Sequence, residues 1–240
     1  MLIAERIESE PIFFAHRGGM ADAEEHTIEA FILAIASGST GLESDAWITA
    51  DRKIILQHSA RFGPFYKRRL FEKSNLADIP ARITSLDSFY KKIKGDYHFS
   101  IDVKAIEAGT QIIDTSMEHN FPLKKLWLCH SEVKNLKEWR EVNPNVRLVN
   151  SSNKSQITEG YERRLANLSK YNINALNLHF SEWNEGLTAL CHRFGVRCFA
   201  WDVQEVRQFI KLFKIGIDGV FSDHTTRMLQ TWKVFSENSY

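Results

Sequence analysis

The 240-residue chain has no excess of charge of either sign and no long apolar run. Its formal net charge is +1, with 25% charged residues, so its overall charge does not predict nucleic acid as a partner. Nowhere do about 18 apolar residues follow one another, and residues 1–18 lack a basic segment followed by an uninterrupted apolar stretch. We therefore expect a soluble, cytoplasmic protein without stable membrane insertion.

Cysteine is scarce, and linker-like sequence is missing. Cys129, Cys191 and Cys198 are an odd number without paired metal-ligand spacing, which fits a reducing compartment better than a disulfide framework. We interpret them as small core residues. The chain is 43% hydrophobic, with no Gly/Ser-rich tract and no internal repeat, so we expect a single domain over residues 1–240.

Short runs rich in Ile, Val, Leu and Phe alternate with amphipathic stretches, a pattern typical of repeated strand–helix units. The eight expected strands are residues 12–15, 41–47, 97–103, 126–129, 146–149, 175–178, 197–201 and 219–222. The clearest helices are expected at residues 27–37, with Thr27 as N-cap and Gly38 as C-cap, 182–193, closed by Gly195, 203–214 and 225–235. This number of units favours an α/β fold of the closed (β/α)8 TIM-barrel type over an open doubly wound sheet.

One segment after the second strand interrupts this rhythm. Residues 48–57 have the pattern of a hairpin, and residues 59–81 contain the basic run Lys67, Arg68 and Arg69. We expect a short insertion here that lies over the mouth of the barrel. The basic run could attract an anionic headgroup, although a solvated basic face is the commoner outcome.

Chemically active side chains follow the first strand. His16 and Arg17 come directly after residues 12–15, at the carboxyl end of the strand, where barrel enzymes carry their catalytic groups. Histidine titrates near neutral pH, and the planar guanidinium of arginine matches phosphate oxygens. Alone, this motif is weak evidence for a site.

Acidic residues recur with a spacing of two in the next strands. Glu43 and Asp45 share one face of the second strand, and Asp102 and Lys104 share one face of the third. Three inward carboxylates would suit Mg²⁺ or Ca²⁺, and the ammonium would suit phosphate. Structural ion pairs between acids and nearby bases are an equally open interpretation.

His58 ends the hairpin and can return to the mouth opposite His16. Cleavage of a phosphodiester needs one group to accept a proton, one to protonate the leaving alkoxide, and positive charge near the phosphate. Together these residues supply each part.

The ordered motifs resemble those of bacterial glycerophosphodiester phosphodiesterases across nearly the whole chain. The matching segments are Ala15-His16-Arg17-Gly18, Glu25-His26-Thr27, Gly41-Leu42-Glu43-Ser44-Asp45, His58, Ile101-Asp102-Val103-Lys104 and Phe199-Ala200-Trp201. The resemblance implies a TIM barrel that hydrolyses a small-molecule glycerophosphodiester to glycerol 3-phosphate and an alcohol with one divalent cation, Mg²⁺ or Ca²⁺. It implies catalytic roles for His16 and His58, metal ligation by Glu43, Asp45 and Asp102, and substrate contacts from Arg17, Lys104 and Trp201.

The chain also departs from the family pattern. Asp102 stands where the family usually has Glu, which predicts a water-mediated contact with the metal, while Ser44 and His26 replace Leu and Asn. No Arg-Thr-Thr element follows His58, so the leaving group stays open. Asp202, near the expected phosphate, would be unfavourable there unless it points away or binds a cation.

Two further histidines and two further functions complete the candidates. His179 and His130 follow or end expected strands and could line the pocket, although structural hydrogen bonding is the commoner role. A lysophospholipase D-like or sphingomyelinase-like activity would need an apolar path beside the mouth, for which the insertion offers aromatic residues. A noncatalytic barrel that binds a phosphate ligand is the alternative from another class. The choice of cation, direct hydrolysis against a cyclic phosphate, and the oligomeric state stay open.

Overall fold

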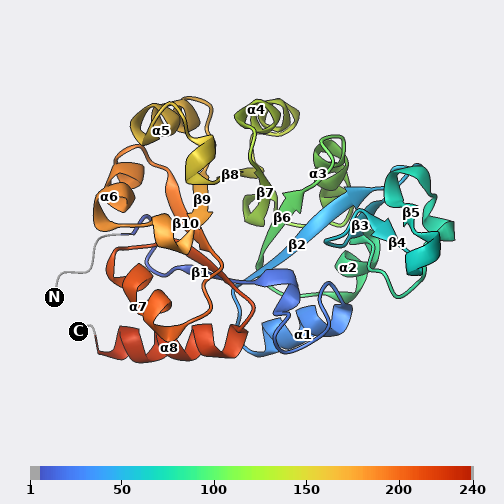
Figure 1. Cartoon of the computed structure of the whole chain (residues 1–240), viewed down its shortest axis with the longest axis horizontal. Coiled ribbons are helices and arrows are strands. Elements are labelled where there is room, and N and C mark those ends of the chain that lie inside the picture. Colours follow the sequence, from blue (N-terminus) through green and yellow to red (C-terminus); the bar gives the residue numbers. More distant parts are fainter. Residues whose placement is uncertain (1–5, 239–240) are drawn as a thin grey trace.

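The computed structural model describes residues 6–238, so residues 1–5 of the N-terminal segment and residues 239–240 lie outside it. The eight barrel strands are β1 (Ile12–Ala15), β2 (Gly41–Ile48), β6 (His98–Val103), β7 (Leu126–His130), β8 (Arg147–Ser151), β9 (Ala175–His179), β10 (Arg197–Trp201) and β11 (Gly219–Ser222). They are parallel, and β1 pairs with both β2 and β11, which closes the barrel (Figure 1). The predicted TIM-barrel fold is confirmed.

A helix follows each barrel strand and covers the outside (Figure 1). These helices are α1 (Ile28–Ala36), α2 (Leu86–Lys92), α3 (Ala108–Glu118), α4 (Val133–Val142), α5 (Tyr161–Lys170), α6 (Glu185–Arg193), α7 (Val206–Lys214) and α8 (Thr225–Glu237). Short 3-10 turns lie at His16–Gly18, Phe65–Lys67, Phe71–Lys73, Leu76–Asp78, Leu123–Lys125, Lys154–Gln156 and Phe180–Glu182.

The predicted strands differ from the observed ones by at most two residues at an end, whereas helix starts were predicted less well. Thr27 caps α1 as predicted, since its hydroxyl accepts a hydrogen bond from the backbone N–H of Ala30. The C-cap prediction was one residue off, because Ser37 takes that place and Gly38 follows it with φ 97°. α6 begins three residues late, at Glu185, because Asn184 caps it by accepting from a backbone N–H.

Apolar side chains fill the barrel interior away from the carboxyl ends of its strands. The rings of Phe14 and Phe221 stack with centroids 4.4 Å apart, and Phe199 meets Phe14 edge-on at 5.5 Å. Gly41 makes room for this plug, because a Cβ there would lie 2.5 Å from Phe14 Cδ1. A larger cluster between strands and helices includes Cys191 and Cys198, and all three cysteines are buried, as predicted. The packed interior leaves the carboxyl ends of the strands as the place for a cavity.

The segment after β2 builds a separate lobe. The predicted hairpin is confirmed, because β2 pairs antiparallel with β3 (Ile54–Leu56). Residues 59–81, here called the arm, contain the small antiparallel pair β4 (Arg61–Phe62) and β5 (Arg69–Leu70). The arm stands beside the barrel rather than over it (Figure 1).

The arm has a core of its own. Phe62 and Phe71 stack at 5.1 Å and are buried together with Ile55 and Ile79. These side chains are therefore committed to holding the lobe together. Within residues 6–238, no helix combines the length and the apolar character that a membrane crossing requires.

Candidate active site

A cavity of about 600 Å³ opens at the carboxyl ends of the barrel strands. All eight residues predicted to form the site line it, namely His16, Arg17, Glu43, Asp45, His58, Asp102, Lys104 and Trp201. They lie on β2, β6 and β10 and on the segments that follow β1, β3 and β6. The fold thus brings together residues that are as far as 185 positions apart in the chain, from His16 to Trp201.

The turn after β1 places a backbone N–H in the site. Arg17 has φ 51° and Gly18 has φ 86°, so the chain reverses sharply. A Cβ on Gly18 would lie 2.9 Å from the Cβ of Ala30, which explains the glycine. In this conformation the Arg17 N–H donates a 2.9 Å hydrogen bond to Glu43 Oε2.

His16 is held by a carboxylate that the sequence reasoning missed. Its Nδ1 lies 2.6 Å from Asp223 Oδ1, and its Nε2 lies 3.8 Å from Glu43 Oε2. Burial lowers the pKa of His16, but Glu43 and Asp223 outweigh that effect and raise it above its usual value. Asp223 directly follows β11, so its position at the end of the eighth predicted strand was a usable signal.

Glu43 and Asp45 face the cavity as their two-residue spacing predicted, and both are buried. Burial, helped by Asp45 and Asp102 against the opposing charge of His16, raises the pKa of Glu43 to about 7. Burial also acts to raise the pKa of Asp45, but contacts with His26 and Lys104 hold it well below its usual range. Asp45 is therefore the firmly charged member of the pair.

Lys104 bridges two of the predicted metal ligands. Its Nζ lies 2.8 Å from Asp45 Oδ1 and 2.6 Å from Asp102 Oδ2. Asp45 and Asp102 are register partners on neighbouring strands, so their side chains emerge on the same face. Burial acts to lower the pKa of Lys104, but these two carboxylates outweigh burial and raise the pKa above its usual value. The ammonium therefore stays charged.

Arg17 and Asp45 both contact His58. Nδ1 of His58 lies 2.8 Å from Arg17 Nη2 and 3.2 Å from Asp45 Oδ2. A neutral Nδ1 can accept from the guanidinium, whereas a protonated Nδ1 can only donate to the carboxylate. Glu25 fixes the same guanidinium through a 2.8 Å contact with Arg17 Nη1.

Two departures from the family pattern touch each other. His26 Nδ1 lies 2.8 Å from Ser44 Oγ, and His26 Nε2 lies 3.5 Å from Asp45 Oδ2. His26 is nearly fully buried, with 2% of its surface exposed. The exchange of Asn and Leu for His and Ser therefore forms one hydrogen-bonded unit behind Asp45.

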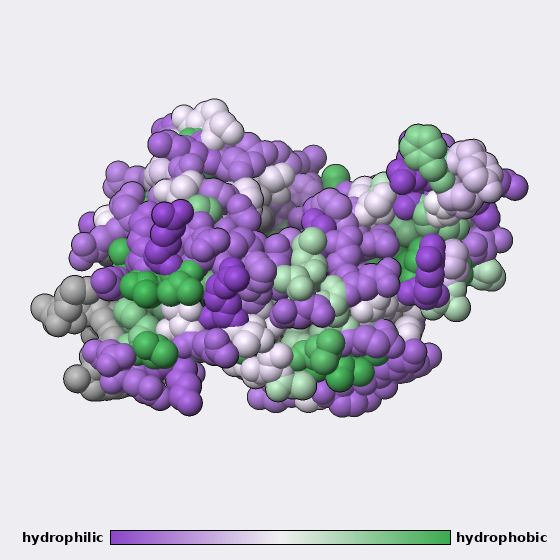
Figure 2. Space-filling model, turned by 60° about the horizontal axis from the view of Figure 1, so that its bottom comes forward, coloured by the Kyte–Doolittle hydropathy of each residue, from purple (hydrophilic) through white to green (hydrophobic). Residues whose placement is uncertain are grey.

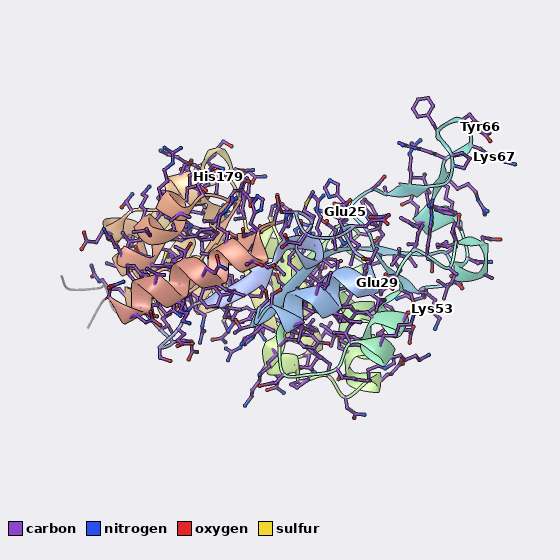
Figure 3. All side chains as sticks on the ribbon, turned by 90° about the horizontal axis from the view of Figure 1, so that it is seen from below. Glu25, Glu29, Lys53, Tyr66, Lys67 and His179 are labelled. Atoms are coloured by element: carbon purple, nitrogen blue, oxygen red, sulfur yellow. The ribbon has the colours of Figure 1, made fainter. Side chains whose placement is uncertain are left out.

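The remaining candidates divide between the cavity and its rim. Asp202 and His130 line the cavity. Asp202 Oδ2 lies 3.2 Å from Nε2 of His179, whose ring meets Trp201 edge-on at 4.7 Å. His179 is not among the lining residues, although it stands at the same end of the barrel (Figure 3).

The predicted position of the insertion was wrong. No residue of the arm, all of which the structure describes, lines the cavity. The physical reason is the separate apolar core, which packs the arm on β3 and away from the mouth. The apolar path that a lysophospholipase D-like activity would need is accordingly not built from Phe62 or Phe71.

A close group of donor atoms also exists far from the cavity. In the described part of the chain, one set of three His, Cys, Asp or Glu ligand atoms lies within 4.8 Å of one another, from His192, Cys198 and Asp218. It sits at the amino ends of β10 and β11. Asp218 Oδ2 is already bonded to the Cys198 N–H at 2.7 Å and His192 Nε2 at 2.8 Å, so hydrogen bonds account for the arrangement.

Comparison with known proteins agrees with this architecture. The model of the glycerophosphoryl diester phosphodiesterase family matches residues 16–70, the part with His16, Glu43, Asp45 and His58. A glycerophosphodiester phosphodiesterase of Caldanaerobacter subterraneus is 23% identical, over 88% of this chain and 93% of its own. The chain is therefore similar in sequence to glycerophosphodiester phosphodiesterases.

Solved structures show the same fold. The glycerophosphodiester phosphodiesterase of Thermotoga maritima superposes with a TM-score of 0.80 at 20% identity, covering 93% of this chain and 99% of its own. A phosphodiesterase of Oleispira antarctica, in complex with the product sn-glycerol-3-phosphate, superposes with a TM-score of 0.77 at 20% identity, covering 93% and 97%.

Proposed function

We propose that this protein, acting as one catalytic domain over residues 1–240, hydrolyses glycerophosphodiesters to glycerol 3-phosphate and an alcohol. The main support is the arrangement of two histidines around one buried acidic pair. His16 Nε2 lies 3.8 Å from Glu43, and His58 Nδ1 lies 3.2 Å from Asp45. The relative from Oleispira antarctica carries sn-glycerol-3-phosphate as its product, which supports glycerol 3-phosphate as the product here.

We infer that the carboxylates at the mouth of the barrel bind one divalent cation. Burial and the neighbouring carboxylates of Asp45 and Asp102 raise the pKa of Glu43 to about 7, so a bound cation would favour the ionised form of Glu43. Mg²⁺ or Ca²⁺ prefers such carboxylate oxygens. In our proposal Glu43, Asp45 and Asp102 hold the ion, which supplies positive charge to the nonbridging phosphate oxygens.

The side chains around the acids then have separate tasks. One histidine of the pair accepts the proton of the attacking oxygen, and the other donates a proton to the leaving alkoxide. Arg17 and Lys104 bind the phosphate, so Lys104 exchanges a carboxylate contact for a phosphate oxygen. Trp201 lines the same cavity and packs against the glycerol part of the substrate.

A panel of glycerophosphodiesters, including glycerophosphocholine and glycerophosphoethanolamine, tests this function. Glycerol 3-phosphate is measured with the untreated enzyme, with a chelator, and after Mg²⁺ or Ca²⁺ is added back. We expect release of glycerol 3-phosphate that the chelator abolishes and one of the two ions restores. A phosphorylated alcohol as product, or full activity in chelator, would contradict the proposal.

A further inference from the structure

The outer end of the arm carries two aromatic side chains that are largely exposed. Phe65 is 87% exposed and Tyr66 is 88% exposed, whereas the next most exposed large apolar side chain in the described chain, Val234, reaches 59%. Figure 2 shows apolar surface at the end of the arm with hydrophilic side chains around it. Phe62 and Phe71 are buried at 7% and 0%. Phe62 and Phe71 thus belong to the core of the arm, whereas the other aromatic pair faces solvent.

Positive charge surrounds the exposed pair. Residues 61–73 contain five basic side chains and one acidic one; the basic residues are Arg61, Lys67, Arg68, Arg69 and Lys73. The guanidinium of Arg68 lies 5.5 Å from the ring centroid of Phe65. Arg69 is partly neutralised by Asp78 at 3.2 Å. The outer end of the arm, residues 65–68, is here called the tip. It combines aromatic rings with a local excess of cations in a protein whose net charge is only +1.

The arm holds this tip on the same side as the mouth of the barrel. In Figure 3, Tyr66 and Lys67 stand at the same upper side as His179 and Glu25, which belong to the carboxyl ends of the strands, while Lys53 lies lower. The stacked rings of Phe62 and Phe71 and the β4–β5 pair keep the arm folded. A surface touched by the tip would therefore face the cavity.

We propose that Phe65 and Tyr66, together with Lys67 and Arg68, dock the protein on an anionic lipid surface with the mouth turned toward it. Aromatic side chains favour the interface between lipid headgroups and acyl chains, and basic side chains are attracted to anionic headgroups. No arm residue lines the cavity, so the tip acts on the position of the enzyme. The benefit of this orientation rests on the proposed function, because lipid headgroups contain the phosphodiester that the cavity would bind.

Sedimentation with vesicles tests the docking without any substrate turnover. The full-length protein is mixed with vesicles of phosphatidylcholine alone or of phosphatidylcholine with phosphatidylglycerol. We expect binding that requires phosphatidylglycerol and weakens in high salt, because exposed charges are screened. Absence of binding to the anionic vesicles would overturn the proposal.

Matched variants locate the contact. The double variant Phe65→Ser with Tyr66→Ser should bind anionic vesicles roughly tenfold less tightly or weaker, since two apolar rings are lost. Lys67→Glu should weaken binding at least about fivefold. The controls are Ile32→Ser with Leu33→Ser, two neighbouring side chains on α1 that are each 50% exposed, and Lys53→Glu. Equal effects of tip and control variants would count against the tip.

Two measurements distinguish lipid docking from self-association and from damage to the barrel. Sedimentation velocity over a range of concentrations, without vesicles, tests whether the tip binds a second copy of the protein. A dimer that the serine variant abolishes would overturn lipid docking. Hydrolysis of soluble glycerophosphocholine should stay unchanged in the serine variant, which shows that the barrel is intact. If no variant hydrolyses that substrate but vesicle binding still depends on the tip, the proposed function fails and the docking stands.

Discussion

Nδ1 of His16, at the end of the first barrel strand, lies 2.6 Å from Oδ1 of Asp223, at the end of the last one. The contact fixes the ring so that Nε2 points toward Glu43. A carboxylate in this position both orients the imidazole and favours its protonated form. Asp223 is thus a positioning residue for one of the two histidines.

Asp223→Asn should therefore lower turnover roughly 10- to 100-fold, by analogy with other carboxylates that orient a functional imidazole. Because Glu43 and Asp223 raise the pKa of His16, loss of the Asp223 charge should move that pKa to lower pH. The limb of the pH–rate profile that reports His16 should shift in the same direction. A purely structural role would lower stability without moving the profile.

Replacement of either histidine tests the acid–base pair directly. His16→Ala and His58→Ala should each reduce kcat roughly 10² to 10⁴-fold. The double variant should lose little more, because the two groups act in one turnover. Near-normal turnover in His58→Ala, or both limbs of the pH profile surviving in each single variant, would refute the assignment.

Glu43→Ala should remove most activity and most of the thermal stabilisation that Mg²⁺ or Ca²⁺ provides. An ion that binds only the folded state raises Tm by mass action, so the loss is visible without substrate. Glu29→Ala is the matched control, since Glu29 lies on α1 away from the mouth (Figure 3). Equal metal-dependent Tm shifts in the two variants would argue against ligation by Glu43.

Lys104→Ala should lower kcat/KM. By analogy with other charge-stabilising donors, the loss should correspond to about 2 to 4 kcal/mol of transition-state stabilisation. The variant also leaves Asp45 and Asp102 without the ammonium that now lies within 2.8 Å of both. Steady-state kinetics with circular dichroism as a folding control measure the effect. Retention of full kcat/KM would show that Lys104 serves only the ion pair.

His98 predicts a pH dependence of stability that is independent of the active site. Its Nδ1 accepts a 3.0 Å hydrogen bond from Trp127 Nε1, and burial lowers its pKa to about 4. The imidazole of His98 binds a proton near pH 6.5 in the unfolded chain but only near pH 4 in the folded chain. The free energy of unfolding should therefore fall, by on the order of 2 kcal/mol, as the pH drops from 6.5 to 4.

His98→Gln keeps an acceptor for Trp127 but does not titrate, so its loss of stability between pH 6.5 and 4 should be smaller. Urea unfolding at several pH values measures the difference. Parallel stability curves for the two proteins would contradict the low pKa of His98.

The sequence by itself determined the barrel and the eight predicted residues that line the cavity. Residues 12–15 and 219–222 were predicted to the residue because these strands are buried along their whole length. The inward direction of Glu43, Asp45 and Asp102 followed from strand parity, which is a local property. The ordered motifs from Ala15 to Trp201 carried the resemblance to the family.

Only the tertiary structure decided which distant groups share a contact. Asp223 meets His16 because barrel closure pairs the first strand with the last, a contact across 207 positions. Lys104 lies between two carboxylates because neighbouring strands are in register, and His26 meets Ser44 because a loop folds back over β2. The arm stands beside the mouth because Phe62 and Phe71 pack with each other, while Phe65 and Tyr66 remain exposed. Residue types alone do not separate these two aromatic pairs, since packing decides which rings are buried.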